Sequence, residues 1–236
     1  MLKEVGNGGM TDDEYVTHFS MWAAVKSPLI MGNDLRKITP STLSILSNPA
    51  VIAVSQDPQG SSAFLRWRYL VDDTDVYGQG EIQMWSGNLY GGDAVVVLLN
   101  AGNKQREMNA TLDDIFWDNG ASLAPQASQT WDIYDLWANR MDNSTAEQII
   151  RGANQTEQYN STSVDDVSSI GQQFRYNATE MGGYGPGLAK NMTILLGKKI
   201  GSVGPHGKLT ATVARHGVRM FRLRLSQDGS HKREEL

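Results

Sequence analysis

The sequence of 236 residues contains no cysteine, which excludes disulfide bonds, thiolate metal sites and cysteine nucleophiles. Long apolar runs are also missing: the longest, Ala94–Leu99, is far shorter than the roughly 20 residues that a membrane-spanning helix needs. Basic residues are not in excess, since the net charge is −5. We therefore expect neither a membrane nor a nucleic acid among the partners, because a nucleic-acid partner calls for a basic patch or stripe.

The common catalytic motifs are absent as well. No G-x-S-x-G, G-x-G-x-x-G or G-x-x-x-x-G-K-[ST] pattern occurs, which removes the elbow-type serine nucleophile and the usual phosphate-binding loops. The four histidines have no i,i+3 or i,i+4 pairing, so no metal site is predicted. The paired aspartates are adjacent in sequence, and adjacent side chains do not point at a common substrate. The sequence therefore predicts no catalytic carboxylate pair within this chain.

What the sequence does contain is a set of six N-glycosylation triplets, where its composition would give about two by chance. Their asparagines are Asn109, Asn143, Asn154, Asn160, Asn177 and Asn191. Glycosylation requires the secretory pathway, yet Met1 and Leu2 are followed at once by Lys3 and Glu4 rather than by an apolar signal segment. We therefore expect the chain to be the C-terminal part of a longer secreted protein. The terminal Arg233–Leu236, which resembles a K-D-E-L signal, makes retention in the endoplasmic reticulum the alternative.

The first part of the sequence predicts a helix–strand–helix rhythm. A capping box, Thr11 with Glu14, and apolar residues at helical spacing predict a helix over Asp12–Val25. The short apolar run Leu29–Met31 is typical of a strand buried on both faces. Thr39-Pro40 and Asn48-Pro49 each place a capping residue before proline, and predict short helices over Pro40–Leu46 and Pro49–Ala53. This part is therefore predicted to be an α/β layer.

After Pro58 the sequence pattern changes to short segments rich in β-branched and aromatic residues, which predict an antiparallel β-sandwich. We expect two domains, residues 1–57 and 58–236. In the last strand, Arg222 and Arg224 alternate with apolar residues and are predicted to face water. Residues 138–190 are polar and are predicted to form a glycosylated surface excursion. The strands are expected over Phe64–Val71, Glu81–Ser86, Ala94–Asn100, Trp131–Trp137, Leu209–Val213 and Val218–Leu225.

The opening segment, MLKEVGNGGMTDDEYVTHFSMWAAVKSPLIMGNDLRKIT, and the later NPAVIAVSQDPQG closely resemble the α-galactosidases of glycoside hydrolase family 27, especially the fungal ones. GEIQMWSGNLYGGDAVVVLLNAG, TWDIYDLW and HGVRMFRLRL resemble the C-terminal β-domain of the same enzymes. The resemblance implies a (β/α)8 barrel followed by an antiparallel β-domain. On this mapping residues 1–57 are the last part of the barrel, from the end of its seventh strand to its eighth helix.

The resemblance also implies an activity: retaining hydrolysis of terminal α-D-galactose residues, with no metal or cofactor. Both aspartates that the family uses for catalysis would lie upstream of Met1, so the chain alone is expected to be inactive. Met1 matches a substrate-lining methionine, whereas Asn33 and Asp34 would have either a supporting role beside the barrel's active face or a purely structural one. The implied partners are α-galactoside oligosaccharides or galactomannan side chains, with homo-oligomer formation as an open option.

Two alternatives remain open at this point. The β-domain could bind carbohydrate without hydrolysing it, because tryptophans can stack on sugar rings, although tryptophans in strands more often belong to the core. A sibling specificity, α-N-acetylgalactosaminidase or β-L-arabinopyranosidase, is equally compatible with the resemblance, since the discriminating residues would lie mostly upstream. The tryptophans in question are Trp67, Trp85, Trp131 and Trp137.

Overall fold

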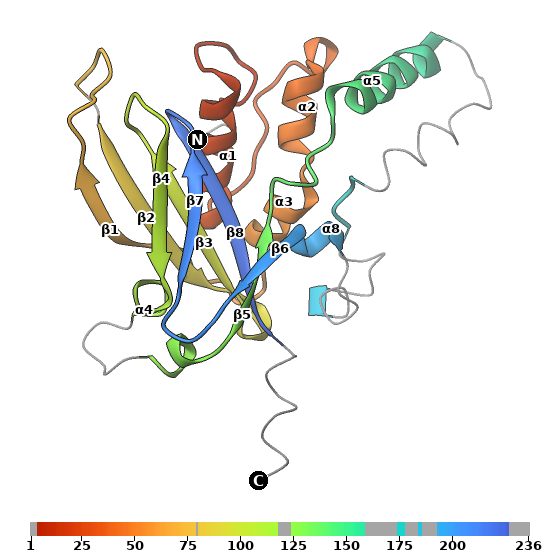
Figure 1. Ribbon diagram of the computed structural model, residues 1–236. Helices are drawn as coiled ribbons and strands as arrows, with labels where there is room; N and C mark the ends of the chain where they lie inside the picture. Colours follow the sequence, from red (N-terminus) through yellow and green to blue (C-terminus); the bar gives the residue numbers. More distant parts are fainter. Residues whose placement is uncertain are drawn as a thin grey trace.

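The structure is a computed structural model that describes residues 4–78, 80–117, 124–158, 174–177, 184–185 and 193–226. Three layers lie side by side (Figure 1): a two-stranded sheet, a six-stranded sheet, and a group of helices from the first part of the chain. No helix within these ranges is both long and apolar enough to cross a membrane.

The helical layer begins with α1 (Asp12–Ala24), followed by the short 3-10 helix η1 (Leu35–Lys37), α2 (Pro40–Leu46) and α3 (Pro49–Ser55). The predicted capping box starts α1, because the Glu14 amide donates to Thr11 Oγ1 over 3.4 Å and the Thr11 amide donates to Glu14 Oε2 over 2.7 Å. Thr39 and Asn48 cap α2 and α3 ahead of their N-terminal prolines. The three predicted helices are confirmed.

The predicted strand Leu29–Met31 is wrong. Met31 forms only an isolated bridge, and the side chains of Ile30 and Met31 are 53% and 45% exposed. A strand buried on both faces needs a hydrogen-bonded neighbour, and the described part of residues 4–57 contains no strand that could pair with this segment. The apolar run therefore lies extended at the surface.

The six-stranded sheet is antiparallel, with strand order β1-β2-β3-β8-β5-β6. The smaller sheet pairs β4 with β7 and lies in front of the larger one in Figure 1. Sequence reasoning missed β4 and β6, because β4 turns only Met108 and Ala110 inward and β6 is mostly exposed. The strands are β1 (Phe64–Leu70), β2 (Glu81–Asn88), β3 (Ala94–Asn100), β4 (Arg106–Thr111), β5 (Trp131–Asp135), β6 (Lys198–Val203), β7 (Lys208–Val213) and β8 (Gly217–Leu225).

Strand β3 shows why the large sheet is the central layer. Its side chains at Ala94, Val96 and Leu98 enter the core between the two sheets, where Phe221 of β8 also packs. The alternate residues, such as Val97, enter a second core together with α1 and α3. Successive side chains of a strand point to opposite faces, so a run that is apolar at every position becomes buried on both faces.

The prediction that Arg222 faces water is wrong, because its side chain is fully buried. The even-numbered face of β8, with Val218 and Met220, is covered by the helical layer rather than by solvent. Only Arg224, near the end of β8, keeps part of its side chain exposed, at 21%. The alternation of arginines with apolar residues predicts a strand with one face in solvent. The helices instead cover that face of β8 with a second apolar layer.

The remaining elements connect the layers. Residues 138–190, predicted as a surface excursion, contain the helix α5, which lies against α2 and buries Ala146 (Figure 1). The described part of this segment is therefore more ordered than its composition suggests. The connecting helices are η2 (Tyr90–Gly92), α4 (Leu112–Ile115), η3 (Pro125–Ser128), α5 (Asn143–Gln158) and α8 (Thr193–Leu196).

The capping box yields a test of stability. Its backbone hydrogen bond from Thr11, aided by the contact of Glu14 with His216, lowers the pKa of the Glu14 carboxyl below its ordinary value of 4.5. The stabilisation from Glu14 is therefore complete above that value and is lost as the pH falls below it. We expect Thr11→Ala to lower the free energy of unfolding by about 1 kcal/mol at neutral pH.

Urea unfolding of the Thr11→Ala chain at pH 7 and at pH 3.5 measures this effect, with Thr11→Ser as the matched control. Thr11→Ala keeps the backbone amide but loses Thr11 Oγ1, which donates to Glu14 Oε2 over 3.0 Å, so its destabilisation should shrink in part at the lower pH, while Thr11→Ser should behave as the parent sequence does. Equal losses at both pH values would contradict the assigned coupling between Thr11 and the Glu14 carboxylate.

Candidate functional site

Asn33, predicted to lie beside the active face, joins two loops. Its Nδ2 donates to the Val5 carbonyl over 2.5 Å and to Asn7 Oδ1 over 3.2 Å. Its own Oδ1 is buried and accepts no hydrogen bond. Gly6, between the two acceptors, has φ +83° and packs directly against Thr42, where a side chain would collide. The loop before α1 is thus held tightly against α2 and the segment after α1.

Asp34 serves its own turn instead. Its carboxylate accepts from the Arg36 amide over 3.1 Å and forms a two-pronged ion pair with the Arg36 guanidinium at 2.8 and 3.0 Å. These Arg36 contacts lower the pKa of Asp34 below its ordinary value. The side chain is therefore engaged locally at the start of η1. Met1, the predicted substrate-lining residue, lies outside the described residues.

Exposed apolar side chains surround this turn. Ile30, Met31 and Leu35 are 53%, 45% and 64% exposed, and all come from the single segment that connects α1 with α2. Apolar side chains gathered on one surface segment mark a site of contact with another protein element. The segment that was predicted to be a buried strand is therefore a candidate contact surface.

A buried ionic cluster, which sequence reasoning missed, joins the helices to the sheet. Arg222 on β8 lies wholly inside, with Nε 2.7 Å from Asp93 Oδ2 and Nη2 3.6 Å from Asp57 Oδ2. Its Nη1 also donates to the Tyr184 hydroxyl over 3.1 Å. A buried charge requires such partners, because an isolated ion is strongly disfavoured inside a protein.

Asp57 connects this cluster to two other segments. Its Oδ1 accepts from the Tyr90 amide over 2.9 Å, while Lys26, just past α1, donates to the Asp57 carbonyl over 3.2 Å. Burial raises the pKa of Asp93 and lowers that of Lys26, as desolvation disfavours both charged forms. The cluster therefore ties the ends of α1 and α3 to the η2 turn and to β8. We interpret it as the joint between the helical layer and the sheet.

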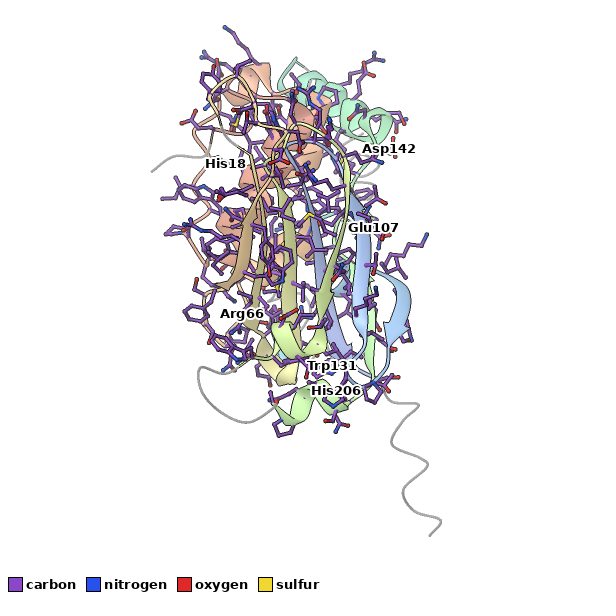
Figure 2. All side chains as sticks on the ribbon, turned by 60° about the vertical axis from the view of Figure 1, so that its left-hand side comes forward. His18, Arg66, Glu107, Trp131, Asp142 and His206 are labelled. Carbon is purple, nitrogen blue, oxygen red and sulfur yellow. The ribbon has the colours of Figure 1, made fainter. Side chains whose placement is uncertain are left out.

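A hydrogen-bonded serine, histidine and aspartate lie at the far end of the sandwich, where Figure 2 labels His206. His206 Nε2 is 3.1 Å from Ser128 Oγ, and its Nδ1 is 2.9 Å from Asp113 Oδ1. The order serine, histidine, aspartate resembles a serine nucleophile activated by a histidine base that a carboxylate orients. However, the His206 side chain is 45% exposed, and its amide donates to the Ala127 carbonyl over 2.7 Å. These contacts hold the turn between β6 and β7 against η3. We therefore assign the three side chains a structural role in fixing this turn.

Two further observations complete the survey of the described residues. No group of three or more histidine, aspartate or glutamate side chains within the described ranges could hold a metal ion. A cavity of about 530 Å³ lies between the connection after β1 and the connection before β4, and its lining is mainly polar and charged. Its lining residues are Leu70, Val71, Asp72, Asp73, Lys104 and Arg106.

The predicted glycosylation sites fall in different places. Asn109 on β4 and Asn143 at the start of α5 are exposed, as an acceptor of a glycan must be. Asn177 is half-buried, and Asn154 lies within α5. Asn160 and Asn191 lie outside the described residues.

Comparison with known families matches two parts of the chain separately. Residues 1–57 match the family model described as alpha galactosidase A. Residues 79–162 match the model described as the alpha galactosidase C-terminal beta sandwich domain. The two matches fall on the helical segment and on the sheet-bearing segment of the structure.

Individual relatives agree over almost the whole chain. Alpha-galactosidase 5 and alpha-galactosidase 1 of Saccharomyces cerevisiae are each 52% identical over 223 residues, which cover 94% of this chain and 44% of the relative. The solved structure of an α-galactosidase from S. cerevisiae has a TM-score of 0.82 at 51% identity, covering 95% of this chain and 46% of that one. For α-galactosidase I from Mortierella vinacea the TM-score is 0.61 at 30% identity, covering 95% and 38%. The chain thus spans less than half the length of these proteins.

The ionic joint gives a prediction about stability. Arg222→Met should lower the free energy of unfolding by about 3–5 kcal/mol, because it removes the nearest cation of the buried Asp57 and Asp93 carboxylates and leaves them only the more distant Lys26 at 3.8 Å and Arg224 at 4.0 Å. Urea unfolding of the chain measures the loss. The double variant Arg222→Met with Asp93→Asn should recover part of it, since one uncompensated charge is removed.

Arg68→Met is the control, because Arg68 is exposed on the outermost strand and its loss should cost less than about 1 kcal/mol. If Arg222→Met were as stable as the Arg68→Met control, the guanidinium would not hold the joint together.

Proposed function

Because the chain belongs to the α-galactosidase family, we propose that the protein of which it forms part hydrolyses terminal α-D-galactose residues from α-galactosides. The observation that carries this proposal is the 51% identity with an S. cerevisiae α-galactosidase over 95% of the chain, at a TM-score of 0.82. Agreement at this level extends through the helical segment as well as the sandwich. The activity is a proposal for the whole protein, since the chain spans less than half of its relatives.

In the proposed protein, catalysis depends on residues outside this chain. Retaining glycosidases use two carboxyl groups about 5–5.5 Å apart, one as nucleophile and one as acid/base. Several aspartates of the chain are already committed to other partners: Asp12 to Arg140, Asp34 to Arg36, and Asp57 and Asp93 to Arg222. We assign both catalytic aspartates to the part of the protein outside this chain, as the family resemblance implies.

The chain's own contribution would be to complete and support the barrel. We propose that the preceding part of the protein covers the exposed Ile30, Met31 and Leu35. Asn33 would then position the loop on the active face, and Met1 would line the substrate. The buried, unpaired Oδ1 of Asn33 supports this role, because it is an acceptor still without a donor.

The substrate class follows from relatives and stays a proposal here. One S. cerevisiae α-galactosidase has been solved with raffinose, and 51% identity with it favours α-galactoside oligosaccharides and galactomannan side chains for this protein. A β-L-arabinopyranosidase from Geobacillus stearothermophilus is 18% identical, so its likeness bears on the fold alone. We also propose two domains, residues 1–57 and 58–236, joined by the Arg222 cluster.

The six glycosylation triplets support a secreted glycoprotein. Retention in the endoplasmic reticulum through Arg233–Leu236 is the alternative localisation. Self-association of the whole protein is part of the same proposal. Light scattering on the purified protein tests it, and a monomer mass would remove it.

The first functional prediction concerns turnover. The pure 236-residue chain should show no hydrolysis of a nitrophenyl α-D-galactoside above the uncatalysed rate, because neither expected aspartate is present. The same chain produced in frame with the upstream barrel sequence should hydrolyse it. Robust turnover by the chain alone would overturn the mapping of the catalytic residues, and no turnover by the longer protein would overturn the proposed function.

The second prediction concerns glycosylation. When the protein is secreted from a eukaryotic host, enzymatic deglycosylation should lower its mass, and Asn109→Gln should remove one glycan, because Asn109 is exposed on β4. Mass spectrometry of the intact protein checks this. Glu107→Gln, on the same face of β4, is the control and should leave the glycan mass unchanged.

A further inference from the structure

We propose that the open edge of the β-sandwich carries a second, non-catalytic saccharide site, formed by the 530 Å³ cavity and by the neighbouring aromatic side chains of β1. The inference goes beyond hydrolysis, since it concerns the sandwich and not the barrel. It rests on the proposed function only for the choice of saccharide, an α-galactoside polymer.

The cavity has preformed walls. One wall, Leu70–Asp73, continues from β1, and the other contains Lys104 and Arg106, which lead into β4. The Asn103 amide donates to the Asp73 carbonyl over 2.9 Å and joins the two walls. Gly102 lets them approach closely, because an added Cβ would lie 3.0 Å from Val71 Cγ2. A volume of this size falls in the range of small-molecule binding sites, roughly 300–1,000 Å³.

The charges in the cavity favour a neutral ligand. Asp72 and Asp73 balance Lys104 and Arg106, so neither an anion nor a cation gains a net attraction. Asp73 and Arg106 form an ion pair with each other, yet Asp73 Oδ2 and Arg106 Nε are buried without a hydrogen-bond partner. One is an acceptor and the other a donor, and a buried group left unpaired costs free energy. The accessible polar groups of the lining are Asp72 and Lys104, an acceptor and a donor, and a sugar hydroxyl pairs with either because it both donates and accepts.

The second component is the pair Trp67 and Tyr69, whose ring centres lie 5.3 Å apart at an interplanar angle of 40°. They pair across the ladder with Met84 and Ile82, so their side chains point to the inner face of the sheet. Because β1 is the outermost strand, it extends beyond the edge of the β4–β7 pair (Figure 1), and Tyr69 remains 61% exposed.

Tyr69 does not itself line the cavity, but it lies on the inner face of β1 next to the wall that begins at Leu70, and Arg106 begins the strand that faces this side of the sheet. An exposed ring beside a polar cavity combines an apolar surface for the C–H face of a sugar with polar groups for its hydroxyls. A saccharide satisfies both components, whereas a purely apolar ligand would leave the charged walls unpaired.

The experiment uses the whole protein and compares two substrates, a soluble galactomannan and a nitrophenyl α-D-galactoside. Tyr69→Ala and Lys104→Ala should each raise the KM for galactomannan by about tenfold, with kcat/KM for the nitrophenyl substrate unchanged. Tyr69→Phe keeps the ring and Lys198→Ala removes an exposed lysine from β6 at the opposite edge, so both controls should behave as the parent sequence does.

Each other outcome contradicts either the second site or the proposed function. If the nitrophenyl substrate is hydrolysed but Tyr69→Ala and Lys104→Ala leave the galactomannan KM unchanged, the second site does not exist. If neither substrate is hydrolysed, the proposed function fails, and galactomannan binding by affinity electrophoresis still decides the site. If the variants instead change the molecular mass by light scattering, the edge binds a second copy of the chain.

Discussion

The structure depends on one buried cation. Arg222 is withdrawn completely from water at the place where the helices meet the large sheet, and Asp57, Asp93 and Tyr184 surround its guanidinium. These three partners come from separate parts of the chain, so the charge on β8 is satisfied only when the end of α3, the η2 turn and Tyr184 are all in place. Buried ionic groups contribute little net stability compared with apolar residues, but the loss of one partner is severe. The cluster therefore imposes one relative position on the helices and the sheet.

This joint explains how a segment resembling part of a barrel can be continuous with a β-sandwich. The large sheet buries both faces, one against the β4–β7 pair and the other against α1–α3. Within the proposed enzyme, the sandwich would hold the last helices of the barrel in place, and the loop fixed by Asn33 would be oriented as a consequence. In that enzyme the exposed Ile30, Met31 and Leu35 would face the proposed preceding part of the protein.

Local signals in the sequence predicted local structure well. The capping residues Thr11, Thr39 and Asn48 determine where α1, α2 and α3 begin, and six of the strands follow apolar or alternating runs. The failures share a physical cause, because each depends on what covers a surface. The apolar run Leu29–Met31 predicts a buried strand, but this segment has no neighbouring strand in the described chain. The alternation around Arg222 predicts a solvent-exposed side chain, but Arg222 lies under helices that are remote in sequence. Likewise, nothing in the local pattern at Asp57 or Asp93 indicates that both meet the same arginine. The cavity beside β1 could not be predicted from the sequence for the same reason, since its two walls are separated along the chain by β2 and β3.

We propose that this chain is one part of a larger α-galactosidase whose catalytic carboxylates lie elsewhere in the protein. The most direct test of this proposal is the intact mass of the native gene product, captured through its C-terminus and enzymatically deglycosylated. The account predicts a mass well above 26.0 kDa and about double it, because the chain covers only 44% of its S. cerevisiae relatives. A mass of 26.0 kDa would mean that the chain exists alone, and would contradict the assignment of an α-galactosidase activity to this gene product.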